Sequence, residues 1–167
     1  MMKVTAPSLP IRMKGSTTSL SEPGAVELLA QDRAGNLYMA VNCGRRVEKY
    51  DAARREWCPI AGLGGTETYS GDGKPATEAY MEVCGLAVDA AGNVFVSGAN
   101  RIRRIAADTG IIETIAGTGR LGFFGDGGPA RNADLGLPTA LTIDRRGTIY
   151  FADTANHRIR AIDPGGR

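Results

Sequence analysis

Two glycine-rich loops hold the residues of this chain that most resemble a ligand-binding motif. Gly71-Asp72-Gly73 and Gly125-Asp126-Gly127 repeat the same Gly-Asp-Gly pattern. A calcium loop of the EF-hand type needs several alternating oxygen ligands and a closing Glu, and neither loop has them. A phosphate-binding loop needs Gly-Lys followed by Ser or Thr ahead of a helix, whereas Gly73-Lys74 is followed by Pro75. We therefore interpret both loops as turns, for which Gly and Asp are typical.

No other group of residues has the spacing of a metal site or of a catalytic nucleophile. His157 is the single histidine, and Cys43, Cys58 and Cys84 are not at metal-ligand spacing. No segment resembles the turn that carries a catalytic Ser. We therefore predict no catalytic residue, no bound metal and no cofactor, and we interpret His157 as structural. The odd number of cysteines favours free thiols in a reducing compartment.

The segments that would position these residues form a repeat with a period of about 55 residues. Asp32-Arg33-Ala34-Gly35-Asn36 returns as Asp89-Ala90-Ala91-Gly92-Asn93 and again as Asp144-Arg145-Arg146-Gly147-Thr148. A fixed period of this size marks an architecture of stacked or radial repeats. Such a fold is a scaffold, and its ligand cannot be inferred from the fold alone.

Each repeat unit contains short apolar runs that are separated by Gly and Asp turns. In the second unit the runs lie at residues 86–88, 94–96, 101–105 and 111–115. β-Branched and aromatic residues between such turns indicate four short antiparallel strands. Ile102 and Ile105 have a helical spacing, but their segment lies between two hairpin turns and is too short for a stable helix. Four strands per unit predict an all-β propeller blade, which needs neighbouring blades to bury both faces of its sheet.

Residues 85–96 and 152–160 resemble the NHL-repeat family. The linker Ile115-Ala116-Gly117-Thr118-Gly119, followed by Gly125-Asp126-Gly127-Gly128-Pro129-Ala130, is similar to the linker of its bacterial branch. The resemblance covers roughly residues 25–163. It implies a six-bladed β-propeller that binds protein, glycan or nucleic acid. A few similar propellers are lyases or lactonases, which usually place metal-binding carboxylates, His or Asn on the central axis.

The chain holds about half of such a ring. We expect a propeller segment at residues 25–167, with blades near 28–62, 85–117 and 140–163. The last blade ends before its fourth strand, so the segment amounts to about 2.5–3 four-stranded antiparallel blades.

The regions outside the blades have a different composition. Short helices are expected near 75–81 and 129–135, where a proline suits the first turn. Residues 1–24 form a lead-in rich in Pro, Ser, Thr and Gly, which is either disordered or contributes one strand at residues 11–14.

Residues that recur in every unit are best explained as structural. Arg46, Arg101 and Arg158 occupy one position in the three units, which favours a role in holding the blades together. The aspartates at the same position of each turn are expected to form that turn; they are Asp32, Asp89 and Asp144.

Function in a propeller is expected where the units differ and where loops line one face. Residues that meet this condition are Trp57, Tyr69, Arg120, Phe123 and Phe124. Phe123 and Phe124 lie in a Gly-rich loop, where exposed rings would form a binding patch. The alternative is that both rings pack under the loop. Trp57 falls late in the first unit, where it could belong to the core instead.

The composition excludes some partners. Twenty basic and eighteen acidic residues give a net charge of +2, which does not favour nucleic acid as a ligand. No apolar run approaches the ~20 residues of a membrane span. The first residues lack the apolar core of a signal peptide. The sequence as it stands therefore favours the cytoplasm, whereas a longer protein that contains it could be secreted or displayed on the cell surface.

We therefore expect a non-catalytic propeller segment that binds a protein or glycan through its loop faces, with Phe123, Phe124, Arg120 and Tyr69 in the binding surface. The alternative is a piece of a propeller lyase or lactonase whose catalytic residues lie in other blades. Half a ring exposes blade faces and a strand edge. We therefore also expect two chains to pair head to tail into six blades, with residues 11–14 of each completing the other's third blade.

Overall fold

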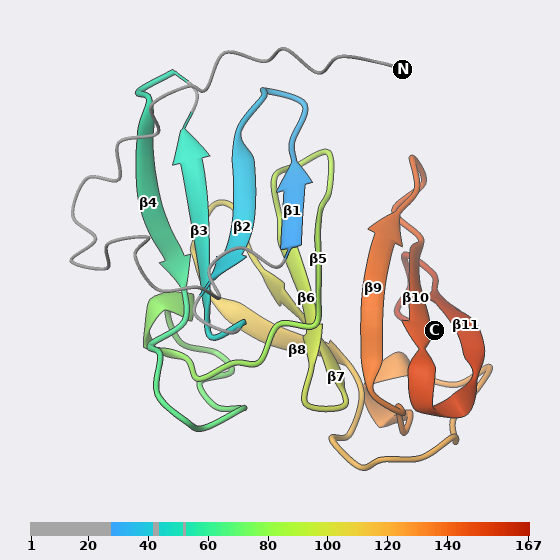
Figure 1. Cartoon of the computed structure of the whole chain (residues 1–167). Coiled ribbons are helices and arrows are strands. Elements are labelled where there is room, and N and C mark those ends of the chain that lie inside the picture. Colours follow the sequence, from blue (N-terminus) through green and yellow to red (C-terminus); the bar gives the residue numbers. More distant parts are fainter. Residues whose placement is uncertain (1–27, 42–43, 52) are drawn as a thin grey trace, which may run out of the picture.

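The computed structural model describes residues 28–41, 44–51 and 53–167 (Figure 1). Three antiparallel sheets follow one another along the chain. Blade 1 comprises β1 (Leu28–Gln31), β2 (Leu37–Val41), β3 (Arg46–Asp51) and β4 (Glu56–Ala61). Blade 2 comprises β5 (Gly85–Val88), β6 (Val94–Gly98), β7 (Arg101–Ile105) and β8 (Ile112–Ala116). Blade 3 comprises β9 (Pro138–Ile143), β10 (Ile149–Asp153) and β11 (Arg158–Ile162), which confirms the predicted all-β propeller class.

The segment with the ambiguous isoleucine spacing is a strand. Ile102 packs in the core between blades 2 and 3, and Ile105 packs in the core between blades 1 and 2. Residues three apart on a strand point to opposite faces. Both isoleucines are therefore buried because β7 has a blade on either side.

Helical structure in the described residues is limited to three single turns, η1 (Ala76–Glu78), η2 (Ala130–Asn132) and η3 (Thr154–Asn156). The first two follow Pro75 and Pro129, as expected, but they are shorter than the expected segments 75–81 and 129–135. In both cases the chain becomes extended at the next alanine, because it must then pair with the earlier part of its own linker. The η3 turn was not predicted from the sequence.

Apolar contact between consecutive blades forms the core. Tyr38, Val47 and Ala61 of blade 1 pack against Val94, Val96 and Ile112 of blade 2. Phe95 and Ile102 of blade 2 pack against Ile149, Phe151 and Ile162 of blade 3. The first strands of the three blades, β1, β5 and β9, also contact one another in order. Each sheet is thus covered by its neighbour, as blades in a radial array are.

The connections divide between two opposite ends of the blades. We call one end the linker face: it holds the linkers 62–84 and 117–137 and the β6–β7 and β10–β11 turns (lower part of Figure 1). Hydrogen bonds from Asn100 Nδ2 to the Gly119 carbonyl and from Ala155 N to the Gly136 carbonyl join these segments. We call the other end the turn face: it holds the β1–β2, β3–β4 and equivalent turns.

Several sequence expectations fall in or beside blade 1. The lead-in, including residues 11–14, and Cys43 lie outside the described residues. Trp57 is buried with Met39 and Val41, and its ring lies 5.3 Å from that of Tyr50, so it belongs to the core. Across the described ranges, no helix has the length and apolarity needed to cross a bilayer.

Candidate functional site

The repeated aspartates of the β1–β2 type turns are saturated with hydrogen bonds. Asp89 Oδ1 accepts from Ala91 N and Asn93 N, both at 2.9 Å. Asp32 and Asp144 accept from the equivalent amides of their own turns. Burial raises the pKa of Asp32, but hydrogen bonds from Asn36, Tyr38 and Ala34 outweigh it and lower the pKa. Carboxylates occupied in this way are poor general bases.

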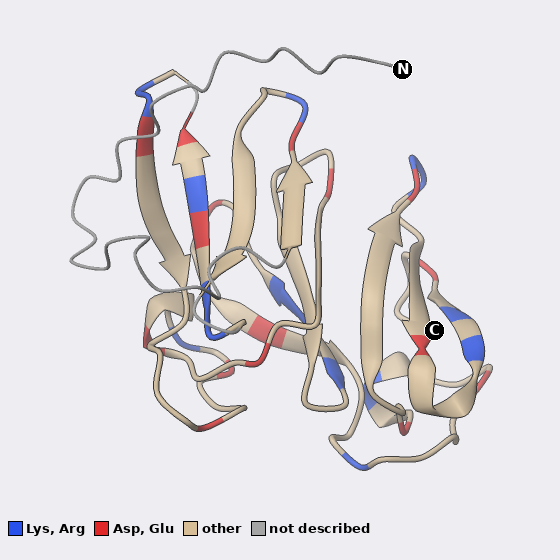
Figure 2. Ribbon diagram, viewed as in Figure 1, with Lys and Arg blue, Asp and Glu red and all other residues tan. Residues whose placement is uncertain are grey.

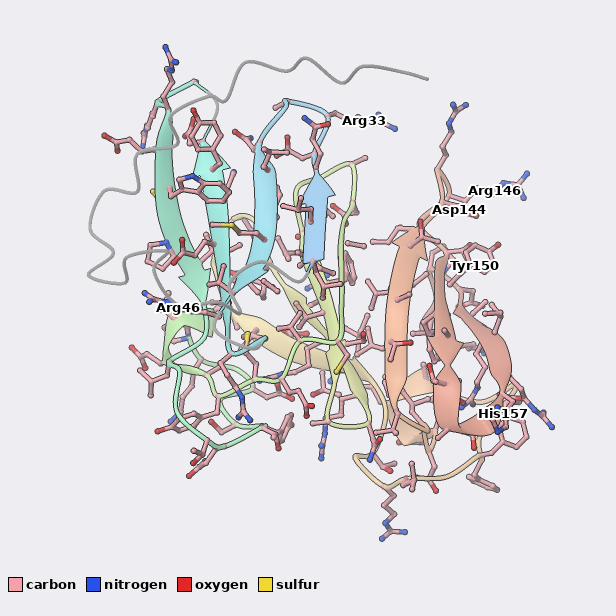
Figure 3. All side chains as sticks on the ribbon, viewed as in Figure 1. Arg33, Arg46, Asp144, Arg146, Tyr150 and His157 are labelled. Atoms are coloured by element: carbon pink, nitrogen blue, oxygen red, sulfur yellow. The ribbon has the colours of Figure 1, made fainter. Side chains whose placement is uncertain are left out.

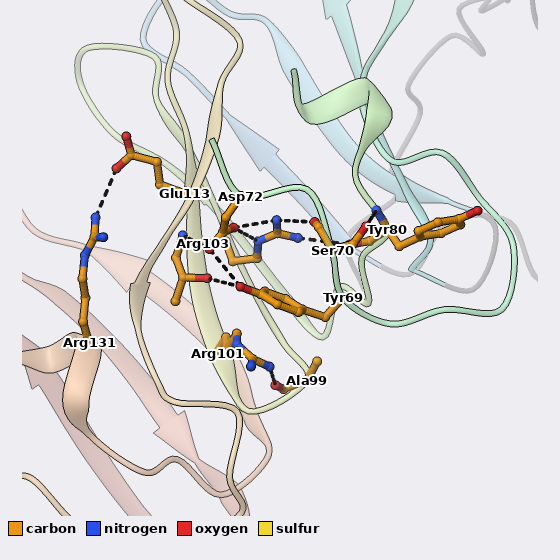
Figure 4. A network of polar contacts seen from close by, with 10 residues as sticks. Tyr69, Ser70, Asp72, Tyr80, Ala99, Arg101, Arg103, Glu113 and Arg131 are labelled. Carbon is orange, nitrogen blue, oxygen red and sulfur yellow. Dashed lines mark hydrogen bonds and ion pairs between the residues drawn. The ribbon is translucent and has the colours of Figure 1, made fainter. Parts of the chain in front are cut away.

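The Gly-Asp-Gly loops are fastened to the next blade by pairs of arginines. Figure 4 shows the first pair, in which Arg101 and Arg103 stack on Tyr69 with Cζ at 3.7 Å and 4.8 Å from the ring centroid. In the second, Arg158 and Arg160 stack on Phe123 at 3.9 Å and 5.2 Å. We call each arginine pair, its aromatic ring and the loop aspartate a linker clamp.

The inner arginine of each clamp makes the stronger bonds. Arg103 Nε and Nη2 donate to Asp72 at 3.0 Å and 2.7 Å, and the guanidinium also donates to the carbonyls of Ser70 and Tyr80. Burial raises the pKa of Asp72, but hydrogen bonds from Thr114, Arg103 and Tyr69 lower it below its usual range. Arg160 donates to Asp126 at 2.6 Å and to the fully buried Asp153 at 3.2 Å. Both loop aspartates thus form ion pairs with an arginine of the next blade.

The arginines that recur in every repeat unit are the outer ones, and the inner ones were not predicted from the sequence. Arg101 donates to the carbonyls of Ala99 and Thr118, and Arg158 covers the Phe123 ring. Arg46 lies half-buried at the start of β3. The position of Arg103 and Arg160 is occupied by the buried Glu48 in blade 1, so the inner arginine does not recur in every unit.

The four predicted binding residues do not form one cluster. Tyr69 is half-buried between two arginines, and its hydroxyl donates to Asp72 at 2.9 Å, so it is committed to the first clamp. Arg120, Phe123 and Phe124 lie together in the second linker. Arg120 is exposed, Phe123 is 42% exposed under Arg158, and Phe124 is 71% exposed.

Exposed apolar side chains gather on the linker face. Five of the eight large apolar residues that are exposed in the described part of the chain lie there, namely Leu63, Leu121, Phe123, Phe124 and Leu137. Phe124 stands where the first linker has Ser70, and the exposed Leu137 stands where the first linker has the buried Val83. The second linker therefore exposes four large apolar side chains, whereas the described first linker exposes Leu63 alone, and sequence reasoning missed Leu121 and Leu137.

The turn face has a different character. Arg33 and Arg146 lie at this end, while His157 lies exposed at the linker end of β11 (Figure 3). An open cavity of about 390 Å³ lies between blades 1 and 2, lined largely by small residues together with Lys49 and Tyr38. Burial, together with a hydrogen bond to Asp32, raises the pKa of Tyr38.

The described residues offer no catalytic arrangement that we can assign. No group of three His, Cys, Asp or Glu side chains among them could hold a metal ion. Cys58 is exposed on β4 and Cys84 is half-buried at the end of the first linker.

Comparisons with known proteins agree with this architecture. No family model matches the chain. The chain is 28% identical to NHL repeat-containing protein 2 of Bos taurus over 137 residues, which cover 75% of this chain. It spans 19% of the length of that relative.

Solved structures with a similar fold include a gluconolactonase and a chain of a protein complex. A gluconolactonase of Xanthomonas campestris matches with a TM-score of 0.57 at 19% identity, covering 86% of this chain and 46% of that one. A chain of a nidogen/laminin complex matches with a TM-score of 0.55 at 18% identity, covering 83% of this chain and 44% of that one. Likeness at this identity shows a shared fold, and functions differ widely among proteins that share one.

Proposed function

We propose that this chain, a β-propeller segment of the NHL-repeat type, is a non-catalytic scaffold that binds another macromolecule through its linker face. The observation that carries the proposal is the concentration of exposed apolar side chains in the second linker. Exposed apolar groups of this kind mark interaction sites in soluble proteins. The aspartates are the candidates for general acid–base catalysis, and they accept hydrogen bonds from their own turns or from arginines instead. A protein or glycan partner is therefore favoured over a reaction.

Peptide and glycan selection tests this proposal. The chain is immobilised and probed with a phage-displayed random-peptide library and with a glycan array. Ligands are then retested on a Leu121→Ser/Phe124→Ser variant and on a Leu29→Ser control. Leu29 and Leu121 are both 65% exposed, but Leu29 lies on β1, away from the second linker. We expect ligands that the double variant loses and the control keeps; ligands insensitive to both changes, or no ligands, would contradict the proposal.

A piece of a propeller lyase or lactonase is the alternative. The lactonase-like fold favours it only at the level of architecture. It predicts converging carboxylates and a bound metal once further blades are present. Stoichiometric metal by elemental analysis of a longer chain, together with lactone hydrolysis, would support this alternative and count against the scaffold.

A second copy of the chain is the proposed partner for the open face of blade 3. Tyr150 and Ile159 of blade 3 are exposed, whereas their counterparts Phe95 and Ile102 of blade 2 are buried against the next blade. Blade 3 thus presents the side chains that dock a following blade. Head-to-tail pairing would place blade 1 of a second copy against this open face of blade 3. Met39 and Trp57 of that blade 1 are buried within their own chain, so both side chains must become exposed before the two copies can pair.

Static light scattering tests the pairing. A dimer that Ile159→Asp converts to monomer is expected, because Asp would place a charge in the apolar contact. A wild-type chain that stays monomeric at all concentrations would rule the pairing out.

A further inference from the structure

Exposed apolar side chains of the second linker lie near Arg120 and Arg158, two arginines with no carboxylate partner among the described residues. Building on the proposed function, we infer that this part of the linker face binds an acidic peptide segment that carries a bulky apolar side chain. The surface consists of Leu121, Phe124 and Leu137, flanked by Arg120 and Arg158.

Backbone hydrogen bonds hold the three apolar residues in one short stretch of surface. Leu121 bridges to Leu135, two residues before Leu137, and Gly122 N donates to the Leu135 carbonyl. The Phe124 carbonyl accepts from Asp134 N at 3.1 Å, which pairs the same two linker segments one step further along. Asn156 Nδ2 donates to the Gly122 carbonyl at 2.7 Å and ties the loop to the β10–β11 turn. The exposed side chains therefore stand on a braced backbone, which lowers the entropy cost of binding.

Leu137 is exposed, and its backbone has a conformation that residues other than glycine rarely adopt. Its φ is +49°, in the left-handed region, and its amide donates to Asn100 Oδ1 at 3.1 Å. A branched residue in this region costs of order 1–2 kcal/mol. Val83, its counterpart in the first linker, is buried. The second linker thus keeps a strained, solvent-facing leucine where the first linker buries a valine.

Exposed basic side chains lie beside this surface. Figure 2 shows basic residues along β11 and in the second linker. Arg120 and Arg158 are exposed, and neither belongs to an ion pair found among the described residues. Of the nearby carboxylates, Asp126 pairs with Arg160, whereas Asp134 accepts a hydrogen bond from the Thr118 hydroxyl and keeps its negative charge. Carboxylates of a partner would meet two exposed arginines that belong to no ion pair of the described residues, which favours an acidic partner.

Other classes of partner fit less well. A sugar ring stacks on an open aromatic face, and Phe124 is the single aromatic residue of this surface, since Leu121 and Leu137 are aliphatic. Nucleic acid is disfavoured because the whole chain has a net charge of only +2. An anionic membrane surface would share the apolar and basic chemistry, so it has to be separated from a peptide by experiment.

The amino-acid composition of the peptides selected from the phage library tests this inference. We expect peptides enriched in Asp and Glu together with Phe, Trp or Leu, bound more weakly as ionic strength rises. Phe124→Ser, which restores the residue of the first linker, should weaken a selected peptide about tenfold or more. Arg120→Glu should weaken it at low salt and much less at high salt. Leu29→Ser should leave the affinity unchanged.

Two outcomes would overturn this inference while leaving the proposed function intact. One is selection of basic or uncharged peptides, or of glycans, that still depend on Leu121 and Phe124. The other is binding of the chain to phosphatidylserine vesicles, reduced by Phe124→Ser, with no acidic peptide selected. Failure of the proposed function itself would look different, because no ligand would then depend on the second linker. Folding of each variant is checked by its circular dichroism and thermal transition.

Discussion

Replacing Arg103 by Met should loosen the first linker from blade 2. The Arg103 side chain is only 4% exposed and donates to Asp72, Ser70 and Tyr80. Met retains much of the volume of the arginine stem, so little of the expected effect comes from an empty cavity. The loss comes instead from two carbonyls left without this donor and from an aspartate left without its countercharge.

The size of the effect follows from the burial of the pair. Removing one partner of a buried ion pair costs about 3–5 kcal/mol. Asp72 is 33% exposed, so water can replace part of what the carboxylate loses. We therefore expect the lower end, about 3 kcal/mol in the free energy of unfolding, and a fall in melting temperature of about 6–12 °C. Urea titration followed by circular dichroism measures the first quantity and calorimetry the second.

The neighbouring arginine provides the control. Arg104 Nε is buried and has no hydrogen-bond partner among the described residues, so Arg104→Met removes an unsatisfied group rather than a bond. That variant should lie within about 0.5 kcal/mol of wild type or be more stable. The reasoning is refuted if Arg103→Met also lies within that range, or if the two variants lose the same stability.

Four further changes have expected outcomes. Asp89→Ala removes the acceptor for two turn amides and should lower the free energy of unfolding by about 1–2 kcal/mol in urea titration, with the blades still formed. Gly117→Ala drives a Cβ into the Asn100 carbonyl and should cost more than 2 kcal/mol, whereas Gly127→Ala, with open space around it, should cost about 1 kcal/mol. The lowered pKa of Asp72 means that its stabilisation is complete above its unfolded pKa of about 3.9 and is lost as the pH falls through the lower folded pKa; Asp72→Asn should flatten acid denaturation there. The raised pKa of Tyr38 acts in the opposite direction, so its stabilisation is complete below its unfolded pKa of about 10 and is lost on raising the pH further; in an absorbance titration Tyr38→Phe should remove a phenol that ionises only on unfolding.

The blades were predictable because their determinants are local. Asp89 and Gly92 close one turn with contacts inside five consecutive residues, and the other copies repeat those contacts. Ile102 and Ile105 were assigned to a strand from the turns around them, and their burial on opposite faces agrees with that assignment. The helices predicted near 75–81 and 129–135 were too long, because the sequence did not show that each linker folds back and pairs with itself.

The clamps were less predictable because they join residues that are distant in sequence. Arg103 reaches an aspartate 31 residues earlier, and only the docking of a linker on the next blade brings the two together. Recurrence favoured Arg101 and Arg158, since the inner position changes to Glu48 in the first unit. The sequence also left undecided whether Phe124 is exposed, because a glycine-rich loop can either cover an aromatic ring or leave it exposed to solvent. Its backbone bond to Asp134 fixes the loop in the arrangement that presents it.

Hydrogen-exchange mass spectrometry with the strongest selected peptide bound tests the linker-face account most directly. The account predicts added protection of backbone amides within residues 117–137 and in the β10–β11 turn, with the Asp89 and Asp144 turns unchanged. Protection confined to those turns at the opposite end of the blades, or to the cavity between blades 1 and 2, would contradict it.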